Sequence, residues 1–259
     1  MNTRHPLLNR TDFRDRLLSE TSYGIFIVSG SAIMAEACST RALDFIVLDM
    51  ESSPLNRETL TYSLQALTGT SVAALVRVAT GERFNIESAL DAGALGIIVP
   101  KVSTGREAKA VVSAASYPPE GTRGLNPIRC SGYFSALADY LASANSRVIK
   151  AIQIETAEGL DNIEEIASVE GIDLIFVGCG DLSAELGCMG NMTSPQMLEA
   201  VATVLDSCRR HGKIPGIFAY SDELAKQYAN MGYRFISFSN DVKLLMSSLE
   251  RTLAHIRPR

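Results

Sequence analysis

The sequence predicts an α/β protein built as a (β/α)₈ TIM barrel, and three observations support this fold class. Short apolar runs rich in Val, Ile and Phe alternate regularly with segments of helical period. The runs lack polar alternation, which is typical of parallel strands buried on both faces. Eight such strand–helix pairs occur in 259 residues, the number and length expected of this barrel.

The expected elements follow one another along the chain without a break. The strands are Tyr23–Val28, Phe45–Leu48, Ala73–Val78, Gly96–Val99, Val148–Ile154, Leu174–Val177, Ile214–Phe218 and Phe235–Phe238. The helices are Ser31–Ala42, Arg57–Leu67, Arg83–Ala92, Gly105–Ala115, Asn162–Ser168, Ser194–His211, Asp222–Asn230 and Val242–Ile256. Ser221 is placed to begin a helix, and Gly93, Gly212 and Gly232 are placed to end helices.

An open, doubly wound sheet is the main alternative to the barrel. The first strand is followed by Ser29-Gly30-Ser31, which is too short for the glycine-rich loop that binds dinucleotides in such sheets. The longest irregular stretch, Tyr117–Phe134, is of a length that is usually functional or covers an opening. No repeat or linker divides the chain, so we expect one domain over residues 1–259.

Composition excludes several classes of protein. The 24 Lys and Arg against 29 Asp and Glu give a net charge of −5, without the basic stripe that nucleic-acid binders usually carry. No apolar run approaches the length of about 18–20 residues needed to cross a membrane. The charged N-terminus has no signal-peptide pattern. We therefore expect a cytoplasmic protein that binds neither nucleic acid nor membranes.

Ionisable residues follow five of the eight expected strands or lie within them. These residues are Asp49, Glu51, Arg77, Lys101, Glu155 and Asp181. In a (β/α)₈ barrel the carboxyl ends of all strands meet at one rim, where the active site lies. Charges that follow buried strands must be paired or must bind a ligand.

Glu155 and Asp181 follow neighbouring strands and form the most informative pair. Two carboxylates are ligands that Mg²⁺ or Mn²⁺ prefers, with other positions left for water and substrate oxygens. The alternative is a salt bridge from these acids to Arg77 or Lys101.

Three further features of the rim each allow two interpretations. Arg77 suits the binding of a carboxylate or an enolate oxygen, or else it is neutralised by Asp49 or Glu51. The amides of the turn Gly178–Asp181 suit a substrate carboxylate, or the glycines only permit a tight turn. Lys101 is a Schiff-base nucleophile only if it is desolvated, and such a lysine is more often a solvated charge or an anion clamp.

Six motifs in one order resemble the HpcH/HpaI aldolase family, the metal-dependent pyruvate aldolases. They are Asp49-Met50-Glu51, Val76-Arg77-Val78, Ala89–Ala94 with Ile98-Val99-Pro100, Tyr117–Gly124, Gln153–Thr156 and Asp181–Gly187. The likeness covers Ser22 to Leu249, and its specificity lies in the common order of the motifs. It implies a (β/α)₈ barrel whose last helix is exchanged between subunits of a homo-oligomer.

The resemblance also implies roles for individual residues. Residues matching Glu155 and Asp181 bind the divalent metal, and the one matching Arg77 stabilises the pyruvate enolate. Amides around Gly180 and Asp181 receive the carboxylate of the 2-oxo acid, and Gln153 matches a residue beside it. Asp49 and Asp91 match acids that orient the catalytic histidine of the family. A metal chelated by a 2-oxo acid would lower the cost of forming the enolate.

The sequence departs from the family at two places in these motifs. The family has Asp-x-Glu-His with the histidine as general base, whereas here Ser52 follows Glu51. The family's Gly-Pro-Ala-Asp is replaced by Gly178-Cys179-Gly180-Asp181. Serine is no base near neutral pH without a partner that takes its proton. His5, His211 and His255 all lie far from the expected rim.

Three outcomes follow from the missing histidine. A metal-bound water or Glu51 takes the role of the base, and the protein remains an aldolase. Alternatively, oxaloacetate is the electrophile and acetyl-CoA the nucleophile, as in the branch of the family that forms citrate for siderophore biosynthesis. In the third outcome catalysis is lost and a module that binds a 2-oxo acid remains. We favour an enzyme, because the rim keeps its charges.

Overall fold

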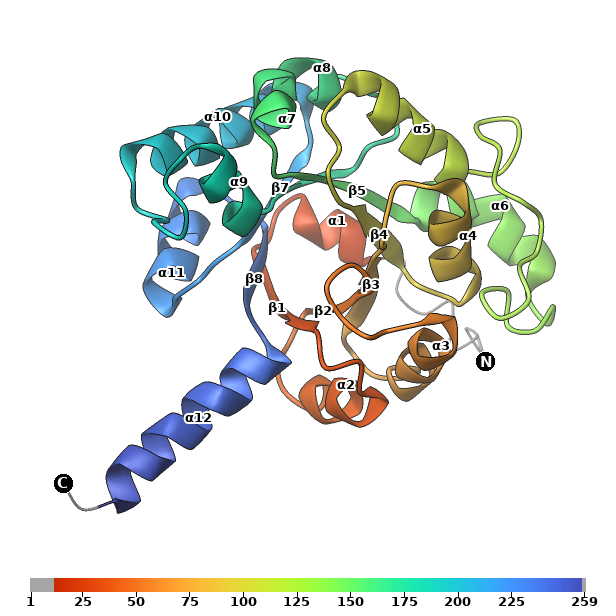
Figure 1. Cartoon of the computed structure of the whole chain (residues 1–259). Helices are drawn as coiled ribbons and strands as arrows, with labels where there is room; N and C mark the ends of the chain where they lie inside the picture. Colours follow the sequence, from red (N-terminus) through yellow and green to blue (C-terminus); the bar gives the residue numbers. More distant parts are fainter. Residues whose placement is uncertain (1–11, 258–259) are drawn as a thin grey trace.

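The computed structural model, which describes residues 12–257, is a closed barrel of eight parallel strands in sequence order. The prediction of a (β/α)₈ barrel is therefore confirmed, and Figure 1 shows the strands surrounded by helices. The strands are β1 (Ser22–Ile27), β2 (Phe45–Asp49), β3 (Ala73–Arg77), β4 (Gly96–Val99), β5 (Ile149–Ile154), β6 (Leu174–Val177), β7 (Ile214–Phe218) and β8 (Phe235–Asn240). Pairing of β1 with β8 closes the barrel.

Twelve helices are present in the part of the chain that the structure describes. They are α1 (Phe13–Leu17), α2 (Ala32–Ser39), α3 (Arg57–Ala66), α4 (Arg83–Asp91), α5 (Gly105–Ala115), α6 (Leu137–Arg147), α7 (Ala157–Asp161), α8 (Ile163–Ala167), α9 (Cys179–Glu185), α10 (Pro195–His211), α11 (Asp222–Met231) and α12 (Asp241–Ile256). Ser221 caps the start of α11, and Gly212 and Gly232 end α10 and α11 in the left-handed conformation, as the sequence predicts.

Large apolar side chains fill the barrel interior, so it is a packed core and not a channel. Phe45 stacks on Phe235, and Phe176 contacts Phe235 edge-on. The short helix α1, which the sequence analysis missed, lies across the amino end of the barrel and buries Phe13 and Leu17 there. With this end closed, the barrel is open to ligands at the carboxyl ends of its strands.

Helix α6 was also not expected from the sequence. Its residues are mostly small or polar, and only Tyr140 and Ala144 are buried, so it lacks a strong apolar periodicity. The irregular stretch 117–134 precedes it and packs beside α4, and its residues do not line the pocket described below. This stretch therefore does not cover the opening of the barrel within one chain.

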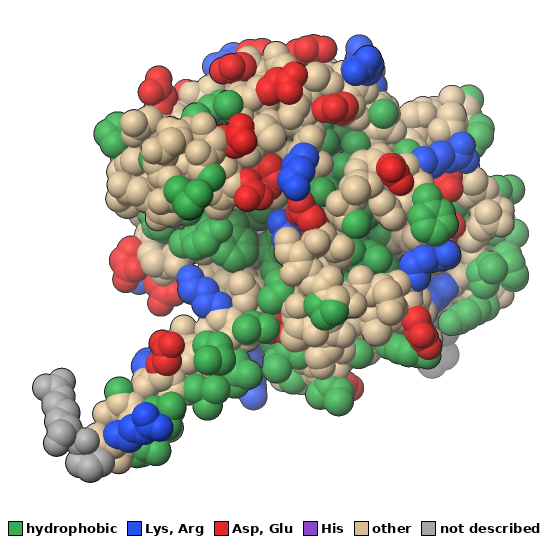
Figure 2. All heavy atoms as spheres, in the orientation of Figure 1, with side chains coloured by type: hydrophobic (Ala, Val, Ile, Leu, Met, Phe, Trp, Pro, Cys, Tyr) green, Lys and Arg blue, Asp and Glu red, His purple; other side chains and the backbone are tan. Residues whose placement is uncertain are grey.

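Helix α12 differs from the other long helices because it leaves the barrel instead of covering it (Figure 1). Its first residue, Asp241, is buried and accepts a hydrogen bond from the Val28 amide at 2.9 Å. Every later residue of α12 is exposed, including the apolar side chains of Val242, Leu244, Leu245, Met246, Leu249, Leu253 and Ile256. Figure 2 shows this apolar surface along the helix. No helix among residues 12–257 is long and apolar enough to cross a membrane.

Candidate active site

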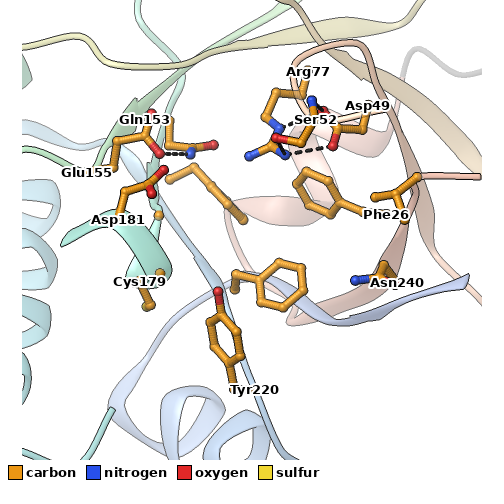
Figure 3. A pocket seen from close by; sticks show the side chains of 15 residues that line it. Phe26, Asp49, Ser52, Arg77, Gln153, Glu155, Cys179, Asp181, Tyr220 and Asn240 are labelled. Atoms are coloured by element: carbon orange, nitrogen blue, oxygen red, sulfur yellow. Dashed lines mark hydrogen bonds and ion pairs between the residues drawn. The ribbon is translucent and has the colours of Figure 1, made fainter. Parts of the chain in front are cut away.

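A pocket of about 370 Å³ lies at the carboxyl ends of the strands (Figure 3). Its lining residues are Phe26, Val28, Asp49, Ser52, Arg77, Gln153, Glu155, Phe176, Gly178, Cys179, Gly180, Asp181, Phe218, Tyr220 and Asn240. Every site residue expected from the sequence lines this pocket except Glu51 and Asp91. The polar residues form two walls, one from β2 and β3 and the other from β5, β6 and the start of α9.

The first wall, which we call the paired wall, consists of Asp49, Glu51, Ser52 and Arg77. Asp49 and Arg77 are direct neighbours in the register of β2 and β3. The Arg77 guanidinium donates two hydrogen bonds to the fully buried Asp49 carboxylate, from Nε at 2.8 Å and from Nη2 at 2.7 Å. Burial opposes the charge of Arg77, but the hydrogen bonds and charge of Asp49, together with the charges of Glu51 and Glu155, raise the Arg77 pKa. The guanidinium is thus a fixed cation in the pocket, held in the bidentate geometry that arginine allows.

The other members of the paired wall also contact Arg77. Glu51 lies 3.2 Å from Arg77 Nη1, just outside the pocket lining, and 3.4 Å from Lys101 Nζ. Ser52 is exposed, and its Oγ accepts a hydrogen bond from Arg77 at 3.4 Å. Arg77 is therefore paired with both Asp49 and Glu51, as one of its two interpretations expected. One face of the guanidinium packs on the Phe26 ring, 5.1 Å from its centroid.

The second wall, which we call the acidic wall, consists of Gln153, Glu155 and Asp181. Ile154 pairs with Val177 in the register, which brings the ends of β5 and β6 together. Glu155 is buried and accepts hydrogen bonds from the Gln153 side-chain amide and from the Lys101 backbone amide, the latter at 2.9 Å. Within residues 12–257, neither Glu155 nor Asp181 has an ion-pair partner, so the expected alternative of a salt bridge to Arg77 or Lys101 is not observed.

No ion pair among the described residues neutralises the acidic wall. Burial raises the pKa of Glu155 to about 7, and the neighbouring charges of Glu51 and Asp181 act in the same direction. The side-chain oxygen of Gln153 is buried and has no hydrogen-bond partner among the described residues. A buried acceptor without a donor and two like charges are both relieved by a cation.

Lys101 contributes to the site through its backbone. Its φ of +56° is in the left-handed region, and its amide donates to Glu155. The Lys101 side chain is 65% exposed and its ammonium group interacts with Glu51, so it is not the desolvated amine that a Schiff-base nucleophile requires. Lys101 also lines a separate neighbouring cavity of about 430 Å³. The expected description as a solvated charge fits this position.

Gly178 is required by a close approach in the acidic wall. A Cβ atom on Gly178 would lie 2.7 Å from Gln153 Nε2 and 2.8 Å from Glu155 Oε2. Asp181 lies in the first turn of the short helix α9, whose first amides have no partner within the helix. Gly178 therefore serves packing around Glu155, and Gly180 and Asp181 border the pocket.

Several pocket residues were not predicted from the sequence, because they carry no charge that would mark a strand end. Phe218 ends β7, Tyr220 follows it, and Asn240 ends β8. Phe26 and Phe176 lie inside strands and form apolar parts of the lining. The signal that could have found Tyr220 and Asn240 was their position directly after or at the end of an apolar run, irrespective of charge.

Asp91 lies away from the pocket of its own chain. Asp91 is the last residue of α4, which runs back to the amino end of the barrel, and it pairs with Arg123 at 2.7 Å. Within one chain it serves Arg123 and does not reach the pocket. His211 contacts Glu164 at the end of α10, and His255 lies on the exposed α12, so neither replaces the missing histidine in this chain's pocket. His5 lies outside the described residues.

The donor set of the acidic wall fits a hard divalent cation. It offers two carboxylates and the unpartnered amide oxygen of Gln153. Residues 12–257 contain no group of three or more His, Cys, Asp or Glu side chains placed to hold a metal. An ion bound here would therefore fill its remaining positions from water and substrate, as Mg²⁺ usually does.

Known proteins resemble this chain in sequence and in fold. A model of the family described as HpcH/HpaI aldolase/citrate lyase matches residues 22–248. The 5-keto-4-deoxy-D-glucarate aldolase of Klebsiella pneumoniae is 35% identical over 232 residues, which cover 90% of this chain and 91% of that one.

Two solved structures are also similar. A HpcH/HpaI aldolase/citrate lyase family protein from Burkholderia cenocepacia has a TM-score of 0.91 and 33% identity, covering 96% of this chain and 100% of that one. The citrate synthase SbnG has a TM-score of 0.85 and 30% identity, covering 93% of this chain and 96% of that one. The chain thus belongs to the HpcH/HpaI aldolase/citrate lyase family.

Proposed function

We propose that the protein is a divalent-metal-dependent enzyme that makes or breaks a carbon–carbon bond of a 2-oxo acid, such as pyruvate or oxaloacetate, by aldol-type chemistry. One observation carries this proposal: an acidic wall without an ion-pair partner among the described residues faces a fixed guanidinium across a pocket of about 370 Å³. The relative from Klebsiella pneumoniae, named as an aldolase, supports the same reaction class.

Glu155 and Asp181 would hold the metal, for which Mg²⁺ and Mn²⁺ are both suitable hard cations. When bound, the metal supplies Lewis-acid polarisation of the keto group, which lowers the cost of forming an enolate. The Gln153 side-chain oxygen, which lacks a hydrogen-bond partner among residues 12–257, lies beside these acids and suits a donor from bound water.

The chain's own residues would orient and stabilise the 2-oxo acid. The two hydrogen bonds to Asp49 keep Arg77 in one orientation. The Arg77 guanidinium can therefore bind the substrate oxygen on which negative charge develops. Amides of Gly180 and Asp181 would receive the carboxylate. Phe26, Phe176 and Phe218 exclude water from part of the pocket and thereby strengthen both interactions.

The proton of the substrate needs an acceptor, and Ser52 does not serve as one. Its Oγ contacts only Arg77 among the described side chains, and arginine takes no proton. Glu51 carries a carboxylate next to Arg77 and Lys101 and is the base that we propose, together with water. A weaker base than histidine predicts a slower or more specialised aldolase.

Hydrogen–deuterium exchange at the pyruvate methyl group tests the proposal, because it requires only enolate formation. NMR should detect exchange with Mg²⁺ or Mn²⁺ and none after EDTA treatment. Absence of exchange with every divalent metal would contradict the proposal and favour a module that only binds 2-oxo acids. Borohydride trapping of pyruvate on Lys101 would replace the metal mechanism by a Schiff base.

A citrate-forming condensation of oxaloacetate with acetyl-CoA is the second candidate. Ser52 in place of the histidine favours it, and so does the likeness to citrate synthase SbnG. In this reaction Arg77 would polarise the keto group of oxaloacetate, and the thioester would supply the nucleophile. Release of free CoA thiol only when oxaloacetate and acetyl-CoA are both present would establish it, and a flat thiol assay would exclude it.

We also propose that the protein is a homo-oligomer in which α12 packs on a second copy. An isolated helix with an exposed apolar face is marginal in water and gains stability by docking. Light scattering should give a mass above that of one chain, and Leu245→Lys with Leu249→Lys should lower it. A monomeric wild type would contradict this proposal.

A further inference from the structure

Tyr220 is a pocket residue with a fixed ring and a free hydroxyl. Its ring lies 5.0 Å from that of Phe218, and the Lys243 ammonium of α12 lies 5.5 Å from its centroid. Lys243 also donates a hydrogen bond to the Tyr220 carbonyl oxygen at 2.9 Å. The hydroxyl makes no hydrogen bond to any residue between 12 and 257, and Figure 3 shows it directed into the pocket on the side of Asp181.

The absence of a side chain at Gly180 leaves space for the Tyr220 hydroxyl. A Cβ atom on Gly180 would lie 2.7 Å from the Tyr220 oxygen, closer than real Cβ contacts, whereas the next ring atom would be 3.8 Å away. The family motif has alanine at this position, so the change to glycine makes room for the phenol. Ser52 and Gly180 are both smaller than the residues they replace, and Tyr220 lies across the pocket from Ser52.

We propose that Tyr220 binds the carbonyl oxygen of the second substrate and donates its proton to that oxygen during condensation. This assignment rests on the proposed aldol function. The enolate carbon of the 2-oxo acid forms the new bond to the carbonyl carbon, whose π electrons move to oxygen. That oxygen takes the phenol proton, and the phenolate regains a proton from water. Cleavage is the reverse sequence.

The surroundings of Tyr220 suit a donor. Burial raises the pKa of the phenol, and Cys179 and Asp181 act in the same direction, so the hydroxyl stays protonated near neutral pH. Nearby Phe26, Phe176 and Phe218 carry no polar group, and Ser52 is engaged by Arg77 on the opposite wall. Tyr220 as a whole is 40% exposed and lines the pocket, and we expect the pocket water to reprotonate the phenolate.

Tyr220→Phe tests the assignment when two reactions are measured on the same preparation with Mn²⁺. The first is methyl exchange of pyruvate, which needs no second substrate. The second is condensation of pyruvate with glyoxylate, glycolaldehyde and propanal as aldehyde probes. We expect exchange to stay within about twofold of wild type, while condensation falls by about 100-fold, as on loss of a general acid. Tyr62→Phe, at an exposed tyrosine on α3, is the matched control and should change neither reaction.

A double-mutant cycle separates this role from simple packing. Gly180→Ala should lower condensation because its Cβ displaces the hydroxyl, and it should cost little further in the Tyr220→Phe background. Equal condensation by wild type and Tyr220→Phe would overturn the assignment, as would a wild type that exchanges pyruvate protons but condenses no aldehyde. Absence of exchange in the wild type would instead reject the proposed function itself and the assignment with it.

Discussion

The two walls of the pocket carry charge in different ways. On the paired wall, Arg77 lies between Asp49 and Glu51, and each charge has a partner of opposite sign. On the acidic wall, Glu155 and Asp181 have no ion-pair partner in the described part of the chain, and Gln153 keeps an unpartnered oxygen. The paired wall is therefore complete by itself, whereas the acidic wall is complete only with a cation.

Removing a carboxylate from the acidic wall should have the largest effect. Glu155→Gln keeps the shape of the side chain but removes one of two anionic ligands, so pyruvate exchange should fall more than about 1000-fold, beyond the loss of a single oxyanion donor. NMR of the methyl signal measures it. Glu158→Gln, an exposed neighbour on α7, should exchange at the wild-type rate. Equal rates in both variants would show that the acidic wall holds no essential metal.

Breaking the paired wall should lower both activity and stability. Arg77→Ala should reduce exchange by about 100- to 1000-fold through loss of an oxyanion donor. It also leaves the buried Asp49 without its partner, which costs about 3–5 kcal/mol of folding free energy. Urea unfolding should detect this loss. The surface pair Arg83–Glu87 offers the contrast, because Arg83→Ala should cost no more than about 1 kcal/mol. Similar losses in both variants would contradict the account of the paired wall.

Placing a histidine at position 52, where the family has its general base, tests whether the missing base limits the reaction. Ser52 is exposed, so Ser52→His has room for an imidazole beside Arg77. Methyl exchange should rise, by about 10- to 100-fold, because a base titrating near neutral pH replaces a weaker one. An unchanged rate would indicate that proton removal does not limit the reaction.

The pH dependence of metal binding should sharpen the contrast between the walls. Glu155 has a pKa of about 7 in the metal-free protein and must lose its proton to bind an ion. Mn²⁺ affinity should therefore fall below pH 7, by at most about tenfold per pH unit. Because Glu51 helps to raise this pKa, Glu51→Gln should move the fall to lower pH. Calorimetry of metal-free protein between pH 5.5 and 8 would measure both curves, and flat curves would contradict the assignment of Glu155.

The raised pKa of Glu155 should also make the stability of the metal-free protein depend on pH. The folded pKa of Glu155 lies above its ordinary value, so the unfolded chain releases this proton at lower pH than the native protein. Metal-free protein should therefore lose stability as pH rises from about 4.5 to 7, and Mn²⁺ should restore it. Thermal unfolding with and without Mn²⁺ would detect the difference, and a Mn²⁺-independent profile would be the contrary result.

The fold and the charged residues of the pocket could be predicted from the sequence, because they depend on the order of the strands and on charges at the strand ends. Alternating apolar runs determine the barrel, and the barrel places Asp49, Arg77, Glu155 and Asp181 on one rim. Tyr220 was missed because a neutral residue after a strand gives no charge signal, although its position was the informative feature. Helix α1 was missed because five residues are too few for a periodic pattern, and ion pairs such as that between Arg14 and Asp173 hold it in place.

The ion-pair partners of the charged residues could not be predicted from the sequence, because they depend on the register of neighbouring strands. Arg77 had possible partners on several strands, and only the register of β2 with β3 selects Asp49. For Asp91 the motif matched the family, but the motif does not give the position in space. Because α4 runs back toward the amino end of the barrel, Asp91 lies at the end opposite the pocket of its own chain.

A titration of Mn²⁺ into the metal-free protein, followed by electron paramagnetic resonance, tests the central claim most directly. One ion should bind per chain, pyruvate should increase its affinity, and Asp181→Asn should abolish the site. The claim would be contradicted by a wild type with no saturable Mn²⁺ site, or by a site that Asp181→Asn and Glu155→Gln leave unchanged.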